Sequence, residues 1–162
     1  MARGNNIIVN PAPRGIFMEG VMAASQTPKP GTIMQMDATV ALVSGRHTFT
    51  PYSRDADGDM PKGPLWVLLP DRLQGKTVTD AYAAGDRCFL YCPLAGDELN
   101  LLLDDISGTT DDHAAGEILM VDTETARLIA TTGSPESEPF LLLEAITDPV
   151  ADTLAWVIYT GY

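Results

Sequence analysis

The chain has 162 residues, of which 45% are hydrophobic, and this is enough for one domain with a core of its own. Its formal net charge is −12, and nine acidic residues but no Lys or Arg lie between Asp97 and Glu124. An acidic surface of this kind repels phosphates, so we expect no nucleic-acid partner. The apolar runs are shorter than the about 18 residues of a membrane span, and no signal sequence is evident. We therefore expect no membrane partner and a soluble protein made in a cytoplasm.

Residues 1–30 are predicted to form an extended N-terminal arm. Prolines at positions 11, 13, 28 and 30 argue against a long helix or an interior strand, because proline fixes φ and removes a backbone donor. Two short apolar clusters, residues 7–9 and 16–18, remain between the prolines. They either fold back over the core of the same chain or dock on a partner, for example by adding a strand to its sheet. The charge distribution favours docking on a partner, since residues 1–30 carry +2 and residues 31–162 carry −14.

Residues 31–162 are predicted to form a β-rich domain. Apolar runs of about 4–8 residues, separated by Gly, Pro, Asp and Ser, are typical of strands and hairpins. The expected strands are residues 32–36, 38–43, 47–52, 65–69 (or a short helix), 87–94, 97–104, 117–121, 126–131, 140–145 and 154–159, with 76–83 ambiguous. Residues 84–133 are expected to form a central β-meander on which the other strands pack. The predicted fold is mainly β: a compact barrel or sandwich of short antiparallel strands with little helix.

The two cysteines, Cys88 and Cys92, are predicted to be free thiols on one face of a strand. Their separation along a strand is about 13 Å, beyond the roughly 4.4–6.8 Å that a disulfide spans between Cα atoms. A metal site that also uses His47 or His113, the only histidines, is the weaker alternative.

Three short motifs have the composition of ligand or catalytic sites but lack the required spacing. Residues 75–77 (Gly-Lys-Thr) follow Pro70, where a phosphate-binding loop needs glycine. The acidic residues 55–59 place glycine at the fourth position of a calcium loop, which needs it at the sixth, and Trp66 stands where that loop needs Glu. Residues 111–113 (Asp-Asp-His) offer an acid and a base without a placed nucleophile. We therefore expect no catalytic, cofactor-binding or metal site.

Three segments of the second half carry a resemblance to a known family. They are residues 84–102, residues 115–130 with the runs AGEILMVD and ARLIA, and residues 143–159, which end in WVIY. This half of the chain, residues 84–162, resembles the capsid decoration proteins of tailed bacteriophages, also called cement or head-stabilising proteins. The likeness is one of strand-and-turn pattern and includes no catalytic motif.

The resemblance implies a β-tulip-like body that binds as a homotrimer to the outer surface of the expanded phage head. An N-terminal arm in such proteins reaches onto the major capsid protein and holds neighbouring subunits together against internal DNA pressure. The implied location is therefore the virion, after synthesis in the cytoplasm of a bacterial host. No enzymatic activity and no cofactor are implied.

The residues expected to bind the capsid all lie in the predicted arm. Apolar contacts are expected from the side chains of the two clusters, and steering from the two arginines beside them. The predicted capsid-binding residues are Arg3, Ile7, Ile8, Val9, Arg14, Ile16 and Phe17. Two alternatives stay open, namely another virion component such as a tail or fibre-base protein, and an enzyme with an unrecognised site.

Overall fold

The computed structural model describes residues 6–10, 15–53, 63–104, 112–122, 124–130, 140–147, 149–150 and 152–161. Within these ranges eleven strands form two sheets, and the only helix is the short 3-10 segment η1 (Arg72–Gln74). None of the described helical structure is long and apolar enough to cross a membrane. The prediction of a compact, mainly β fold with little helix is confirmed.

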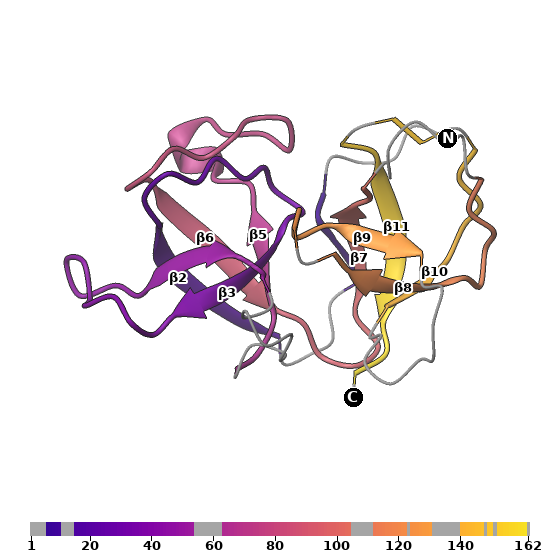
Figure 1. Cartoon of the computed structure of the whole chain (residues 1–162), viewed down its shortest axis with the longest axis horizontal. Helices are drawn as coiled ribbons and strands as arrows, with labels where there is room; N and C mark the ends of the chain where they lie inside the picture. Colours follow the sequence, from indigo (N-terminus) through magenta and orange to yellow (C-terminus); the bar gives the residue numbers. More distant parts are fainter. Residues whose placement is uncertain are drawn as a thin grey trace.

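The first sheet is a closed barrel of five strands (Figure 1). Around the barrel the order is β2-β4-β3-β5-β6, and the pairing of β2 with β6 closes it. The β2–β4 pair is parallel, and the other four pairs are antiparallel. The strands are β2 (Ile16–Met22), β3 (Ile33–Asp37), β4 (Thr48–Pro51), β5 (Trp66–Leu69) and β6 (Arg87–Cys92).

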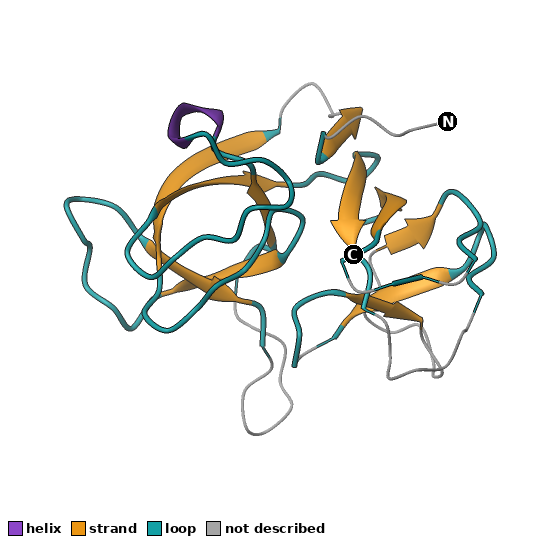
Figure 2. Cartoon of the chain, turned by 90° about the horizontal axis from the view of Figure 1, so that it is seen from above, coloured by secondary structure: helices purple, strands orange, loops and turns teal. Residues whose placement is uncertain are grey.

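The second sheet has six antiparallel strands in the order β1-β7-β11-β10-β8-β9. It curves so that β9 returns to the end of β7, where the backbone N–H of Asp104 donates to the Leu128 carbonyl at 2.8 Å. Figure 2 shows the ring of the five-stranded barrel beside this second, strongly curved sheet. The strands are β1 (Ile8–Asn10), β7 (Glu98–Leu102), β8 (Ile118–Val121), β9 (Leu128–Ala130), β10 (Phe140–Leu142) and β11 (Leu154–Tyr159).

Alternation along the barrel strands divides their side chains between two cores, because successive residues point to opposite faces of a sheet. On β5, Trp66 and Leu68 belong to the barrel interior, whereas Val67 between them packs against the second sheet. Ile33 and Tyr91 face the second sheet in the same way. One apolar core therefore lies between the two sheets and joins them. It also contains Leu99, Leu101, Leu119, Leu128, Phe140, Leu142, Ala155 and Val157 from the second sheet.

The predicted boundary at residue 30 does not separate an arm from a body. Strand β2 has β4 on one side and β6 on the other, so it is an interior strand of the barrel, and β1 belongs to the second sheet. The proline argument was wrong for residues 16–22, because the prolines lie before or after this run and none lies inside it. The alternative that the two apolar clusters fold back on the core of the same chain describes this arrangement.

Two further predictions about the strands are wrong. Residues 84–133 are not a meander, since β6 lies in the barrel and β7 in the second sheet, and only β8 and β9 pair as neighbours. The turn at residues 93–96, with φ of 97° at Gly96, leads from one sheet to the other. Residues 38–43 form an exposed connection in place of a strand. Residues 76–83, which the sequence left ambiguous, form no strand.

Candidate functional site

The five apolar residues predicted to bind a partner differ sharply in exposure. Ile7 is 2% exposed and Ile8 is half-buried, whereas Val9, Ile16 and Phe17 are 44%, 52% and 63% exposed. The two predicted arginines, Arg3 and Arg14, lie outside the described residues. The structure therefore leaves Val9, Ile16 and Phe17, here called the N-terminal apolar residues, accessible to a partner.

Ile7 is a structural residue because the segment around it is bound to β7. The Asn100 backbone N–H donates to the Ile7 carbonyl at 2.7 Å, and the Asn100 side-chain amide donates to the Asn6 carbonyl at 2.7 Å. Ile8 is aligned with Leu99 in the antiparallel β1–β7 pair. The side chain of Ile7 enters the core shared by the two sheets, where it is not available to another protein.

Phe17 is held on the outside of the barrel by the ring of Tyr91. These residues face each other across the β2–β6 pair, and their ring centroids lie 4.9 Å apart at an interplanar angle of 47°. Gly15 leaves room for the tyrosine, since a Cβ at position 15 would lie 2.2 Å from the Tyr91 ring. The exposed phenyl ring is therefore supported from below by a fixed aromatic neighbour, a tilted arrangement that aromatic pairs favour.

Tyr91 is itself fixed by a buried hydrogen bond. Its hydroxyl donates to Oδ2 of Asp97 at 2.6 Å, and the same oxygen accepts the Leu94 backbone N–H at 2.7 Å. Burial, and then the contact with Asp97, raise the pKa of Tyr91, so the phenol remains a proton donor at neutral pH. This bond also fixes the turn that leads from β6 to β7.

The Gly-Lys-Thr motif of residues 75–77 binds neighbouring groups of the same chain. After η1, Lys76 Nζ contacts Asp86 Oδ2 at 3.0 Å and donates to the Ala81 carbonyl at 2.9 Å. The Thr77 backbone N–H donates to Asp80 at 2.8 Å. Lys76 and Thr77, together with Pro70 and Arg72, border a surface hollow of about 370 Å³. The hollow therefore offers a ligand neither a free lysine nor a free backbone donor at position 77.

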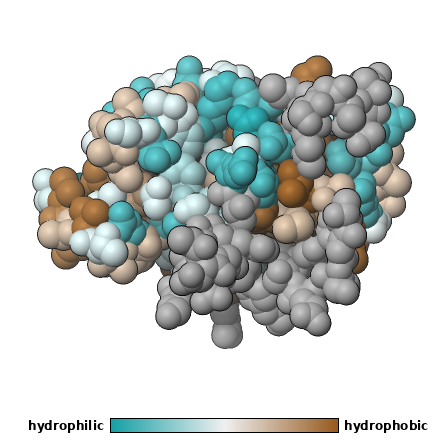
Figure 3. All heavy atoms as spheres, viewed as in Figure 1, coloured by the Kyte–Doolittle hydropathy of each residue, from teal (hydrophilic) through white to brown (hydrophobic). Residues whose placement is uncertain are grey.

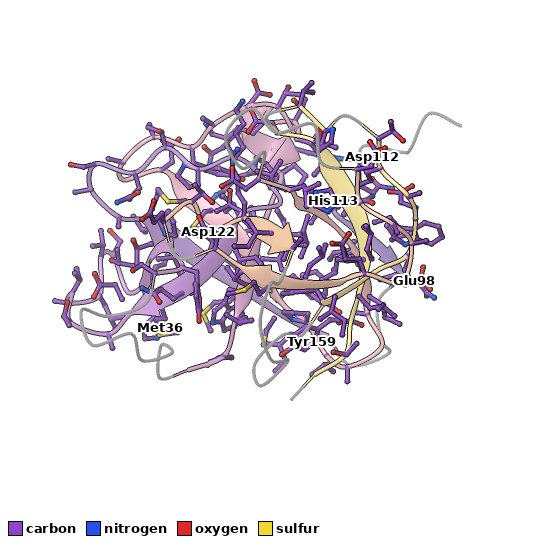
Figure 4. The ribbon with its side chains drawn as sticks, turned by 45° about the vertical axis from the view of Figure 1, so that its right-hand side comes forward. Met36, Glu98, Asp112, His113, Asp122 and Tyr159 are labelled. Atoms are coloured by element: carbon purple, nitrogen blue, oxygen red, sulfur yellow. The ribbon has the colours of Figure 1, made fainter. Side chains whose placement is uncertain are left out.

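The acidic and histidine motifs do not form a metal centre in the part of the chain that the structure describes. His113 Nδ1 lies 3.0 Å from Glu117 Oε2, but no group of three His, Cys, Asp or Glu side chains is placed there to hold a metal. Figure 4 shows Glu98, Asp112 and Asp122 spread over separate parts of the molecule. The acidic segment 55–59 and Asp111 fall outside the described residues.

The two cysteines are free thiols on β6, as predicted. Cys88 is fully buried and Cys92 is half-buried, and both pack in the barrel interior. Burial raises the pKa of Cys88 to about 12 and also raises the pKa of Cys92. Both thiols therefore stay protonated near neutral pH, which makes them poor nucleophiles and poor metal ligands.

A charged cluster joins the barrel to the second sheet beside a cleft of about 260 Å³. Asp152 binds Lys29 Nζ through Oδ2 and Arg127 Nη2 through Oδ1, each at 2.6 Å. The hydrogen bond from Lys29, together with the charge of Arg127, lowers the pKa of Asp152. Because this carboxylate pairs with both cations, and Arg127 also lies 3.7 Å from Asp104, the cluster is a structural clasp between the sheets.

The sequence interpretation missed one exposed apolar feature, the connection between β3 and β4. Residues 38–45, here called the hairpin tip, are all exposed, and Val40, Leu42 and Val43 are 44%, 56% and 45% exposed. The same composition suggested a strand, because an apolar, β-branched run is typical of one. A distinguishing signal was the Ser44-Gly45 turn at the end of the run, which marks the tip of a hairpin.

No protein-family model matches this chain, and no curated protein matches it either.

Proposed function

We propose that this chain is a non-enzymatic structural protein of a virion, a decoration or cement protein on the outer surface of a tailed-phage head. The observation that carries the proposal is the exposure of Ile16 and Phe17 on a rigid strand of the barrel. The resemblance of residues 84–162 to decoration proteins supports it. In this proposal the protein binds the major capsid protein as a homotrimer, bridges neighbouring subunits and stabilises the head against internal DNA pressure.

The physical properties of these residues fit attachment to a protein surface. Burial of apolar area contributes roughly 25 cal/mol per Å², and aromatic side chains are enriched among the residues that dominate binding energy. Phe17 is already supported by Tyr91, so little conformational freedom is lost when its outer face is covered. The acidic surface disfavours DNA, which suits a protein on the outside of a DNA-filled shell.

The decisive test is co-sedimentation with expanded heads of the virus that encodes this chain, stripped of the protein beforehand. Wild type is compared with the double variant Ile16→Ser/Phe17→Ser. Both positions are more than half exposed, so the variant should fold, and its Kd for heads should rise about tenfold or more. Leu73→Ser is the matched control, because Leu73 is 82% exposed and lies on η1. The control should bind as wild type does.

Each outcome of this experiment has a distinct meaning. Absence of wild-type binding would contradict the decoration proposal and direct the search to the tail or fibre base, where labelled protein can be located by electron microscopy. Equal binding of wild type and the double variant would keep the function but move the contact away from β2. Deleting residues 1–30 is not an equivalent test, because the deletion removes an interior strand of the barrel.

A further inference from the structure

The hairpin tip is an ordered element although all of its residues are exposed. At one end, Asp37 Oδ1 accepts hydrogen bonds from the backbone N–H and the hydroxyl of Thr39 at 2.9 and 2.6 Å. At the other end, Val43 and Arg46 exchange two backbone hydrogen bonds, at 2.9 and 3.0 Å. The residues between them, Ser44 and Gly45, have φ of 52° and 78°, the positive values that a type I′ hairpin turn requires.

The base of the tip is attached to the barrel. Arg46 Nε donates to Glu19 Oε1 of β2 at 2.6 Å, and the Val21 backbone N–H donates to the His47 carbonyl at 2.9 Å. A partner that covers the tip therefore meets a preformed surface and loses less binding energy to ordering.

The surface of the tip is apolar and carries no charge. No ionisable residue lies between Asp37 and Arg46, in a chain whose net charge is −12. Figure 3 shows a hydrophobic cluster at the end of the molecule where this connection projects from the barrel. Its apolar residues are Ala38, Val40, Ala41, Leu42 and Val43, all exposed. An exposed apolar patch bordered by polar residues is typical of an interaction site.

Size and charge indicate the kind of partner that fits. A stable interface takes about 20–30 residues from each side, whereas the tip has eight, so two tips in contact would not hold two copies together. A concave groove covers several faces of a projecting hairpin at once, and basic residues at its border would complement Asp37, whose bonds with Thr39 favour the charged carboxylate.

We propose that the hairpin tip inserts into an apolar groove with basic residues at its border on the capsid surface, as a second contact beside the N-terminal apolar residues; this inference rests on the proposed function. The two contacts lie near opposite ends of β2. Ile16 pairs with Cys92 at one end, and Val21 pairs with Thr48, next to the base of the tip, at the other.

The distance between the two contacts along β2 determines whether they can bind the same part of the shell. Five positions of strand separate Ile16 from Val21, roughly 16 Å at about 3.3 Å per residue, and the tip projects beyond Val21. The two contacts therefore meet separate places on the shell. Two weak contacts held by one rigid barrel bind far more tightly than either alone, because the second forms at a high effective concentration.

The test uses the same stripped, expanded heads and the double variant Leu42→Ser/Val43→Ser. Its Kd for heads should rise about tenfold or more, while its melting temperature stays that of wild type, because both side chains are exposed. Leu73→Ser/Val150→Ser removes two exposed apolar side chains elsewhere and should bind as wild type does. Sedimentation velocity of wild type and of the tip variant, without heads, is run in parallel.

The outcomes separate this inference from the proposed function. If wild type binds heads and the tip variant binds equally well, the tip is not a contact and the decoration proposal stands. If wild type does not bind heads, both proposals fall. If the tip variant instead abolishes a concentration-dependent self-association of wild type, the occupant is a second copy, and the groove on the shell is wrong.

Discussion

Gly20 occupies a position on β2 where no side chain fits. A Cβ at this position would lie 2.4 Å from the ring of Phe49 inside the barrel. Gly20→Ala therefore overpacks the interior and should lower the free energy of unfolding by about 1–3 kcal/mol. Urea denaturation followed by tryptophan fluorescence measures this change.

The control for this prediction removes the obstructing ring. Phe49→Leu is destabilising on its own, because Phe49 is completely buried. In the Phe49→Leu background, however, Gly20→Ala should be tolerated better than in wild type, giving a positive coupling in a double-mutant cycle. Additive effects would show that the clash with Phe49 is not the cause of the instability.

At the scale of elements, the connection before β11 is joined to the barrel by the Asp152 clasp. Asp152→Asn keeps the shape and tolerates the positive φ of 68° at this position, but it loses the charge that pairs with Lys29 and Arg127. We expect a lower free energy of unfolding at pH 7, measured by urea denaturation. The effect should shrink in a Lys29→Met background, where one of the two pairs is already absent.

The loss of stability caused by Asp152→Asn should depend on pH. The pKa of Asp152 is lower in the folded protein than its ordinary value of 3.8, so its contribution is fully present above that value. The contribution is lost as the pH falls through the lower, folded-state pKa. The stability difference between wild type and Asp152→Asn should therefore be constant from pH 5 to 8 and diminish below about pH 4. A difference that grows in acid would contradict the assignment.

The existence of most strands could be predicted from the sequence, but their partners could not. Apolar runs bounded by turn residues located nine of the eleven strands in the described ranges, because burial favours such runs locally. The surrounding prolines predicted an arm that included β2, and no local signal opposed this, because β6, one of the two partners of β2, lies far along the chain. Residues 38–43 show the opposite error, since an apolar run without a facing strand remains an exposed hairpin.

The sequence located the apolar clusters of the candidate site, but it did not show which of their residues are exposed. The sequence pointed to the apolar clusters around Ile7 and Phe17, but composition does not reveal which face of a strand meets the core. The structure buries Ile7 against β7 and exposes Phe17 on the barrel. Exposure at each position follows from the register of β1 and β2 with strands distant in sequence, which no local pattern contains.

At the scale of the whole molecule, the two sheets are joined by one apolar core. Ile33 lies on the barrel, is completely buried and packs in this shared core. Ile33→Ala should lower the free energy of unfolding by about 2–5 kcal/mol while wild type and variant each unfold in a single transition. The variant loses packing in the core between the two sheets. Both sheets should lose stability together, because each depends on the other to cover its apolar face.

The two tryptophans provide the measurement, since each reports on one sheet. Trp66 lies on β5 of the barrel, and Trp156 lies on β11 of the second sheet. In Trp156→Phe the fluorescence follows the barrel, and in Trp66→Phe it follows the second sheet. For each single-tryptophan variant, the unfolding curve measured by fluorescence should coincide with the curve measured by circular dichroism. This should hold both with and without the additional substitution Ile33→Ala. A separate transition for either sheet would show that they unfold independently.

The pairing of the first strands with distant ones also determines when they fold during synthesis. Ile16 faces Cys92 on β6, and Ile8 faces Leu99 on β7, so these residues lack the strands that face them until about 75 or more further residues have been made, although β2 can meet β4 earlier. Translation of the about 75 intervening residues takes roughly 4–15 s at about 5–20 residues per second. Throughout that interval Ile7, Ile16 and Phe17 have no strand to pair with. These apolar side chains therefore remain unpaired while the residues that face them are still being synthesised.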